Sequence, residues 1–364
     1  MRPKRHQGGN YLLDFSGEYQ HNYKKLFYTH HFGKIFNTDQ NYQYWQSLQE
    51  LQQIVARRLK SNIYATPKYW LKAIFLITTA IYLNYLRFTQ PSNTIAILLG
   101  LNYALLGLNV LHDANHGSIS QKPIINRIMC YVGDLGGISG LIWRDKHTMH
   151  HMETNSHQDP DFDTQPVLSL STDYRHQPKK SKHYQFQHLY IWPLLTQIPI
   201  THHFTELKTL FKYRYAHDFL GNLIAKVFFL GYYYFIFWWQ YPEYWYLPII
   251  QNAVTGLYLG FFFIISHNFE GTRLINYWNY DHDQDWAEDQ IATTSSVGGY
   301  WLGEINGGLN YQVEHHLFPK VCHVHYVKIQ PIVRDYCQRR GWHYHYFPSI
   351  WQNFVSTYRH LRLK

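Results

Sequence analysis

Histidines spaced at helical intervals are the residues of this sequence with the most evident chemistry. In the stretch 307–319, Gln312, His315 and His316 lie three and four residues apart. If this stretch is helical, the three side chains share one face and project into one volume. Neutral imidazole is a common metal ligand. The spacing therefore predicts a metal-binding segment here.

Two upstream histidine groups have comparable spacing. They are His112 with His116, and His147 with His150 and His151. In a chain with 25 histidines, a single H-x-x-x-H pair is weak evidence of a ligand pair. Three groups of matched spacing together indicate one shared metal site. The histidines at 30–31, 202–203, 323–325 and 343–345 lack this spacing, and we interpret them as surface or hydrogen-bonding residues.

Long apolar runs separate the histidine groups and must position them. Four runs, at about 69–88, 94–111, 222–239 and 245–266, are long enough at about 1.5 Å per residue to cross a hydrocarbon core of about 30 Å. Turn-like sequences join the first run to the second and the third to the fourth. The sequence predicts an all-α integral membrane protein with four transmembrane helices in two hairpins. Residues 67–364 would form this membrane domain.

The distribution of charge predicts how the chain is oriented. The turn at 240–244 is aromatic and has no Lys or Arg, whereas the segments outside the hairpins are basic. By the positive-inside rule, both termini and all the histidine groups lie in the cytoplasm. Because four spans return the chain to its starting side, the groups can meet in one helical cytoplasmic cap. His267, directly after the fourth run, reaches the same place.

The remaining segments are interpreted as cytoplasmic or interfacial. Residues 1–66 are polar and aromatic, without a signal peptide, and form a predicted cytoplasmic segment with an amphipathic helix at about 44–59. The runs 131–143 and 188–200 are too short or too interrupted to span a membrane, so we expect interfacial helices there.

Net charge and cysteine content argue against other classes of protein. A net charge of +9 would suggest nucleic acid as a partner of a soluble protein, but here the basic residues flank apolar runs. Anionic membrane lipid is the simpler partner, and no nucleic acid is expected. The three cysteines have no paired spacing, which predicts neither a disulfide framework nor a zinc knuckle. The metal would be held by nitrogen.

The number of histidines indicates two metal ions. The candidate ligands are His112, His116, His147, His150, His151, His267, His315 and His316. Four nitrogen ligands per ion would hold two iron ions with positions open for O2, whereas a structural zinc site needs only four ligands in all. Gln312, Asp113 and Asp159 are candidates either for metal ligation or for orienting the ligands, and Asp161 for orienting them alone.

Three segments resemble the histidine boxes of membrane fatty acid desaturases. They are 112–117 (HDANHG), 143–151 (WRDKHTMHH) and 307–319 (GGLNYQVEHHLFP), and the likeness extends through 190–192, 286–294 and 322–326, covering about 95–345. Gln312 at the start of the third box is similar to the front-end group, which inserts a double bond between an existing one and the carboxyl end. The resemblance implies a di-iron enzyme that uses O2 and two electrons to remove two hydrogens from an acyl chain, carried on lipid or CoA.

The sequence also differs from many front-end desaturases. These carry a fused cytochrome b5 domain with a His-Pro-Gly-Gly motif, which the stretch 6–9 (HQGG) only superficially resembles. The chain is more similar to unfused cyanobacterial-type Δ6 desaturases. This likeness implies a separate electron donor, either ferredoxin or cytochrome b5. Met152-Glu153 stands where Tyr-Thr is usual, a difference that bears on regioselectivity.

Two other functions are compatible with the same residues. An acyl-chain hydroxylase on the same di-iron scaffold would differ only in returning oxygen to the substrate after the first hydrogen is removed. A non-catalytic membrane protein that binds metal or haem would need far fewer aligned histidines. The fatty acid products of a host that expresses the chain would distinguish the three.

Overall fold

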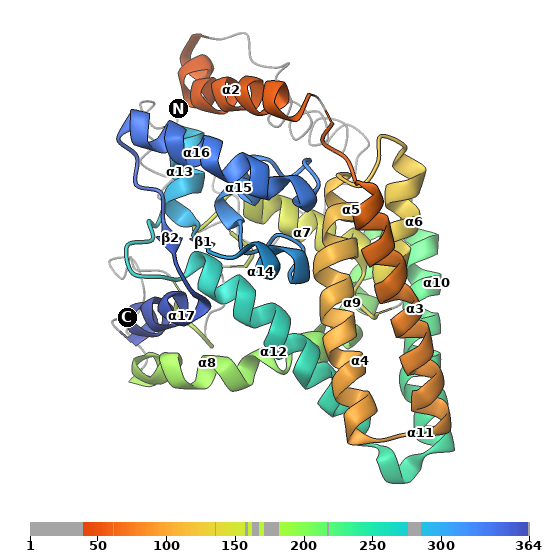
Figure 1. Cartoon of the computed structure of the whole chain (residues 1–364). Coiled ribbons are helices and arrows are strands. Elements are labelled where there is room, and N and C mark those ends of the chain that lie inside the picture. Colours follow the sequence, from red (N-terminus) through yellow and green to blue (C-terminus); the bar gives the residue numbers. More distant parts are fainter. Residues whose placement is uncertain are drawn as a thin grey trace.

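The structure is a computed structural model, and it describes residues 39–60, 62–134, 136–156, 159–161, 167–170, 182–216, 218–275 and 285–362. These residues are mostly helical. Long helices extend together toward one end of the molecule, and shorter helices gather at the other end (Figure 1). The part of the predicted cytoplasmic segment before residue 39 lies outside the described residues.

The first two long helices lie side by side and are joined at the far end of the molecule (Figure 1). Helix α3 (Pro67–Thr89) begins with Thr66 as its cap, and α4 (Asn93–Leu106) begins with Ser92, whose hydroxyl accepts a bond from the backbone of Ile95. Such hydroxyl caps satisfy amide groups that a helix start leaves free. Helix α4 continues through a π-helical turn, η1 (Gly107–Leu111), into α5 (His112–His116).

The second pair of long helices follows after residue 218. Helix α10 (Phe219–Leu230) continues through the π-helical segment η5 (Gly231–Ile236) into α11 (Phe237–Gln240). A short turn, η6 (Pro242–Tyr244), leads to α12 (Leu247–His267). Four helical stretches are long and apolar enough to cross a membrane: Pro67–Thr89, Asn93–His116, Phe219–Gln240 and Pro242–His267. They coincide with the four predicted runs and extend each by a few residues.

Helix α12 packs more extensively on α4 than on any other described helix. Glycine permits this close approach, because a Cβ atom on Gly100 would lie 2.5 Å from the backbone oxygen of Gln251. Small residues at such contacts let helix backbones approach each other closely within a membrane. The contact between α4 and α12 brings the ends of the second and fourth spans together.

The prediction of a helix at 131–143 was wrong, whereas the run 188–200 is helical as predicted but is divided between two helices. The first run is divided between α6 (Pro123–Asp134) and α7 (Gly140–Met152), because the chain turns at Gly137, whose φ of +95° favours glycine. The second is divided between α8 (Gln187–Leu195) and α9 (Ile198–Leu210). Short 3-10 turns, η3 (Lys182–Phe186) and η4 (Phe211–Tyr213), flank this pair.

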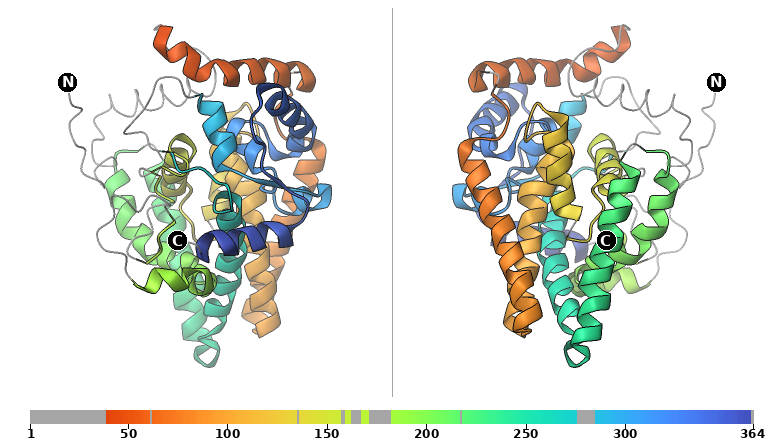
Figure 2. Two further views of the ribbon diagram at one scale, coloured as in Figure 1. Left: turned by 90° about the vertical axis from the view of Figure 1, so that its left-hand side faces the viewer. Right: turned by 90° about the vertical axis from the view of Figure 1, so that its right-hand side faces the viewer.

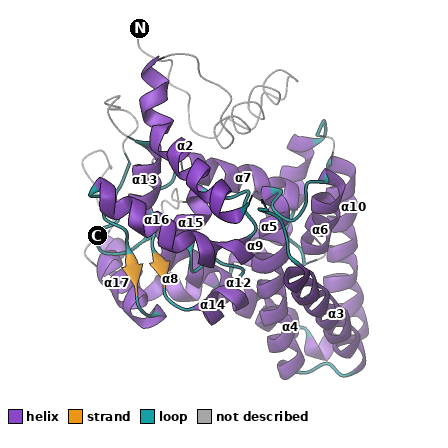
Figure 3. Cartoon of the chain, turned by 45° about the horizontal axis from the view of Figure 1, so that its top comes forward, coloured by secondary structure: helices purple, strands orange, loops and turns teal. Residues whose placement is uncertain are grey.

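The remaining elements lie away from the turns that join the long helices (Figure 1). They are α13 (Trp286–Thr293), α14 (Tyr300–Ile305), α15 (Gln312–Leu317), η8 (His323–His325), α16 (Tyr326–Arg340) and α17 (Ile350–Arg362). Strands β1 (Ser296–Val297) and β2 (Tyr346–Phe347) pair in parallel and lie beside each other in Figure 3. This small sheet ties the C-terminal segment to the chain before α14.

Helix α2 (Asp39–Leu59) lies across the top of these elements, as both views of Figure 2 show. It corresponds to the helix predicted at 44–59 and begins earlier. Its apolar face, which includes Leu48 and Leu51, packs in one core with Trp286 of α13 and Ile329 of α16. Burial of these side chains holds α13, α15 and α16 together. The division of the chain at residue 66 stays a prediction.

Candidate metal centre

All eight histidines predicted as ligands lie together and are buried. His112 and His116 come from α5, His147, His150 and His151 from α7, His267 from the end of α12, and His315 and His316 from α15. The π-helical turn η1 precedes α5 directly. Segments more than 200 residues apart in the sequence therefore place imidazoles in one region.

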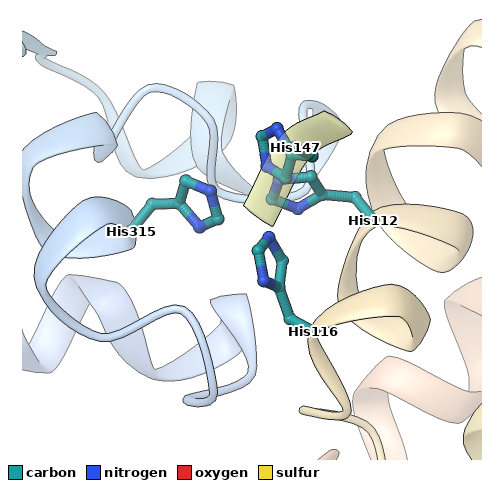
Figure 4. Close-up of side chains that lie close together, drawn as sticks. All are labelled: His112, His116, His147 and His315. Carbon is teal, nitrogen blue, oxygen red and sulfur yellow. The ribbon is translucent and has the colours of Figure 1, made fainter. Parts of the chain in front are cut away.

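The first cluster consists of His112, His116, His147 and His315. One ring nitrogen of each lies within 4.8 Å of the others. The rings point toward a common centre from three different segments (Figure 4). The ring centroids of His112 and His315 are 4.3 Å apart. Four nitrogen atoms at this spacing can surround one metal ion.

The second cluster consists of His150, His267 and His316, whose ligand nitrogens also lie within 4.8 Å of one another. His151 lies between the two clusters. It forms a further group with His315 and His316 at the same spacing, and its ring stacks on His316 with centroids 4.2 Å apart. Two neighbouring clusters joined by His151 have the donor set for two ions.

Oxygen atoms outside the second cluster fix the orientation of its rings. His150 Nδ1 donates to the Asp159 carboxylate at 3.0 Å. His267 Nδ1 donates to the Thr293 backbone carbonyl at 3.2 Å, and His316 Nδ1 donates to Gln290 Oε1 at 2.9 Å. All three partners can only accept, so Nδ1 carries the proton in each ring. Each Nε2 atom keeps its lone pair for a metal.

The first cluster is held by other contacts. His315 Nδ1 lies 3.2 Å from the Tyr326 hydroxyl, and the His147 ring stacks on Trp143 with centroids 4.2 Å apart. His147 and His151 approach each other at 3.1 Å between their Nε2 atoms. These contacts restrict the rings to positions around the common centre.

The predicted auxiliary residues have different surroundings. Asp159 lies against His150, as an orienting role requires, whereas Asp113 accepts bonds from His323 Nδ1 (2.7 Å) and Cys322 Sγ (3.2 Å). Asp113 therefore ties α5 to the segment after the third histidine group. Asp161 pairs with Lys146 at 2.7 Å, and its carboxylate lies 3.9 Å from His150.

Gln312 points into the second cluster. Its Nε2 atom lies 3.0 Å from His267 Nε2, the nitrogen that the Thr293 carbonyl leaves available for a metal. Helix α15 begins at Gln312, so Gln312, His315 and His316 share a face, as their spacing predicts. The amide of Gln312 can thus approach a metal in this cluster.

Burial keeps most imidazoles of this site neutral. It lowers the pKa of His147, His151, His315 and His316 well below the usual value. Burial also acts to lower the pKa of His150, but the Asp159 carboxylate outweighs it and raises that pKa. Neutral imidazoles bind metal without first losing a proton.

Several buried ring nitrogens of the site lack hydrogen-bond partners, which also fits metal binding. The Nε2 atoms of His315 and His316, and both ring nitrogens of His112, have no hydrogen-bond partner among the described residues. Buried polar atoms are rarely left without partners, because desolvation costs free energy. Metal ligation would satisfy the one lone pair on each of these neutral rings, so the residues present fit bound metal ions.

Two glycines bring the third histidine group onto the first. Gly307 and Gly308 have φ angles of +61° and +75°, which residues other than glycine rarely adopt. A Cβ atom on Gly307 would lie 2.3 Å from the Leu108 backbone oxygen, in the turn before His112. Asn109 of the same turn donates to the Ile305 carbonyl at 2.8 Å. Glycine at residue 307 permits this close approach to the turn before α5, and Gly308 permits a close approach to His323 and Tyr326.

A buried polar network holds the start of α7. The backbone of Ser139, the cap of α7, donates to the Glu206 carboxylate at 2.8 Å. The same carboxylate pairs with Lys226 at 2.7 Å, and both side chains are almost fully buried. Asn222 accepts a bond from the backbone of Leu141 at 3.1 Å. Helices α9 and α10 thereby fix the helix that carries three of the histidines.

Sequence reasoning missed Gln290, Thr154, Tyr326 and Trp143. Thr154 follows His150 by four residues, a helical spacing that could have suggested contact. Gln290 lies in the stretch 286–294, which carries part of the family likeness, but nothing in the spacing relates it to His316. Packing between distant segments brings these side chains to the site.

Comparisons with known proteins agree with this geometry. The family profile described as fatty acid desaturase matches residues 90–348. The acyl-lipid (7-3)-desaturase of Diacronema lutheri is 34% identical over 321 residues, which cover 83% of this chain and 70% of that protein. The sn-1 linoleoyl-lipid 6-desaturase of Synechocystis sp. is 30% identical over 289 residues, covering 73% of this chain and 78% of that protein. The acyl-lipid (8-3)-desaturase of Physcomitrium patens is 30% identical over 335 residues, covering 83% and 68%.

Proposed function

Because the chain belongs to the fatty acid desaturase family, we propose that its two histidine clusters bind two iron ions that desaturate a lipid-bound acyl chain. The chain is an oxidoreductase of lipid metabolism, an acyl desaturase. The observation that carries the proposal is the meeting of eight buried histidines from four helices.

The donor set favours iron over a structural metal. The site offers neutral imidazoles, and a structural zinc ion would use only four ligands and close its coordination sphere. When bound, two iron ions supply the reduction of O2 and the removal of two hydrogens from the acyl chain. The balance is one –CH2–CH2– unit, O2, two electrons and two protons giving –CH=CH– and two water molecules.

The chain's own residues hold and orient the donors. Asp159, Thr293 and Gln290 keep the protons of three ligand rings on Nδ1, which leaves Nε2 to face the metal. Complete burial of His315 and His316 excludes bulk water from their side of the site. The imidazoles that would bind metal are thus distinct from the groups that orient them.

Gln312 and the relatives support a front-end desaturase. The relatives' names include lipid 6-desaturase, (7-3)-desaturase and (8-3)-desaturase. Gln312 lies beside His267, at the place where it would adjoin a metal of the second cluster. We therefore assign an acyl-lipid substrate and insertion of the double bond on the carboxyl side of an existing one.

The proposed topology places both termini and the histidine clusters on the cytoplasmic side, with the four spans arranged as two hairpins. The turn at η6 has no basic residue, whereas α16, beside the clusters, carries Lys328, Arg339 and Arg340. Tyr326, the first residue of α16, lies against His315. A basic surface would attract an acidic electron donor, so we assign a ferredoxin or cytochrome b5 as the donor.

Expression in a host that lacks polyunsaturated lipids, together with a competent electron donor, tests this function. Analysis of total fatty acids is expected to show a new double bond. A hydroxylated product would support a hydroxylase instead. An unchanged profile despite iron-loaded protein and donor would indicate a binding protein and contradict the proposal.

A pair of histidine variants tests the metal site. His315→Ala removes a ligand of the first cluster and is expected to abolish desaturation and lower the iron content of purified protein. His343→Ala is the matched control, because His343 is exposed, belongs to neither cluster, and lies with its ring beside that of His345. If His343→Ala lost as much iron as His315→Ala, the ligand assignment would be wrong.

A further inference from the structure

Gln290 of α13 lies beside the second cluster, although it is remote in sequence from all the histidine boxes. Its side chain is 1% exposed, and its Oε1 atom lies 2.9 Å from His316 Nδ1. We propose that Gln290 is a positioning residue that makes His316 present Nε2 to the metal of the second cluster. This inference rests on the proposed metal site.

A second oxygen supports the same proton position on His316. The Thr154 hydroxyl oxygen lies 3.3 Å from His316 Nδ1 and 3.1 Å from Gln290 Oε1. Thr154 also donates to the His150 backbone carbonyl at 2.7 Å. Two oxygen atoms therefore surround Nδ1, which is the environment of an N–H donor. The other nitrogen, Nε2, has no hydrogen-bond partner among the described residues and lies within the second cluster.

Helix α13 is built to hold Gln290 in place. The Asp285 carboxylate caps its start by accepting from the backbone of Ala287 at 2.9 Å, and Trp286 is buried in the core with α2. The backbone carbonyl of Thr293, at the end of α13, accepts from His267 Nδ1. One helix thus supplies the acceptors for two of the three histidines of the second cluster.

The first cluster takes its support from other elements. His315 is held by Tyr326 of α16, and His147 stacks on Trp143 of α7. A change at residue 290 should therefore weaken the binding of one metal ion and leave the binding of the other unchanged. A general loss of structure would weaken both.

Variants at residue 290 distinguish the effect of the acceptor oxygen from the effect of packing around it. Gln290→Leu removes the acceptor, so His316 can place its proton on Nε2 and cease to be a ligand. Gln290→Glu keeps an oxygen acceptor, as Asp159 does for His150. Loss of such an outer partner lowers metal affinity by about 10- to 100-fold. Asp289→Asn is the matched control, since Asp289 is equally buried on α13 but faces Arg273.

Anaerobic titration of the purified full-length apoprotein with Fe2+ is the test. The unaltered chain should bind two equivalents, and Gln290→Leu should bind one of them about 10- to 100-fold more weakly. Gln290→Glu and Asp289→Asn should bind both as the unaltered chain does. Titration with Co2+ gives a spectroscopic readout, because loss of an imidazole ligand changes the visible absorption of one cobalt ion only.

The outcomes distinguish this inference from the proposed function. Two equivalents in the unaltered chain with unchanged affinity in Gln290→Leu would overturn the role of Gln290 alone. Equal weakening of both metals, or the same loss in Asp289→Asn, would show that α13 acts only through stability and would also overturn it. Fewer than two equivalents in the unaltered chain would overturn the proposed di-iron site and this inference with it.

Discussion

Single residues of the metal centre divide into imidazoles that face the metal and oxygens that face the imidazoles. Burial keeps most of the rings neutral, since it lowers the pKa of His147, His151, His315 and His316. The oxygens of Asp159, Thr293 and Gln290 decide which nitrogen the rings of His150, His267 and His316 present. Neutrality comes from the surroundings as a whole, and orientation from specific contacts to Nδ1.

Asp289 gives a pH-dependent prediction that does not involve the ligands. Burial raises its pKa to about 7, although Arg273 acts to lower it. The folded state therefore binds this proton more tightly than the unfolded chain, whose carboxyl pKa is near 3.8. Its contribution to stability is complete below about pH 4 and is lost as the pH rises through about 7.

Asp289→Asn should remove this pH dependence, because the amide stays neutral at every pH. The unfolding temperature of the variant relative to the unaltered chain is expected to rise between pH 5 and pH 8. Thermal unfolding in detergent, followed by tryptophan fluorescence, measures the difference. Parallel curves for the two proteins across this range would mean that Asp289 does not titrate as described.

Elements of the fold bring the histidine groups together by close backbone contact. The π-helical turn η1 carries the second span into α5, and the turn at Gly307 packs on its carbonyl groups. Helix α7 is fixed at its start by the Glu206–Lys226 pair, which lies between α9 and α10. Each histidine group thus depends on a contact outside its own segment.

Gly307→Ala tests the contact between the first and third groups. Its φ of +61° makes any side chain cost about 1–2 kcal/mol, and the clash with Leu108 should add about 1–3 kcal/mol. We expect a lower unfolding temperature together with loss of bound iron, measured on purified protein by thermal unfolding and metal analysis.

Gly341→Ala is the matched control for this clash. Gly341 ends α16 with a φ of +70°, and a Cβ atom there would meet no atom within 4 Å. The control should lose only the stability due to backbone conformation and should retain its iron. Equal losses in the two variants would show that the approach of Gly307 to Leu108 does not matter to the site.

The whole molecule has four long apolar helices at one end and the metal centre near the other end of these helices (Figure 1). The proposed orientation places the η6 turn on the non-cytoplasmic side of the membrane and the elements around α16 on the cytoplasmic side. Because the second hairpin has two spans, the histidines between the hairpins and those after the second hairpin can share one side.

Cysteine labelling tests this orientation. In a chain expressed in a bacterial inner membrane, Glu243→Cys in η6 should react with an impermeant thiol reagent in intact spheroplasts. His343→Cys should react only after permeabilisation, and the unaltered chain, whose Cys322 and Cys337 are buried, gives the background. Labelling of His343→Cys in intact spheroplasts, or protection of Glu243→Cys, would reverse the assigned topology.

Local patterns were enough to predict the spans and the histidine groups. Helical spacing of His147, His150 and His151, and long runs of apolar residues, are properties of neighbouring residues and can be read from the sequence. The same reasoning failed at 131–143, because the turn at Gly137 depends on a backbone conformation that an apolar run conceals. The contact of Gln312 with His267 agrees with the prediction that the end of the fourth span and the third histidine group meet.

Tertiary structure alone decided which distant residues support the site. Gln290 and His316 meet through packing of α13 on α15, and Asp113 meets His323 across 210 residues of sequence. The sequence determined that eight imidazoles would gather at one side of four spans. The partner of each imidazole was decided by the packing of distant elements, because a hydrogen bond needs two atoms within about 3 Å and spacing along the chain does not specify that distance.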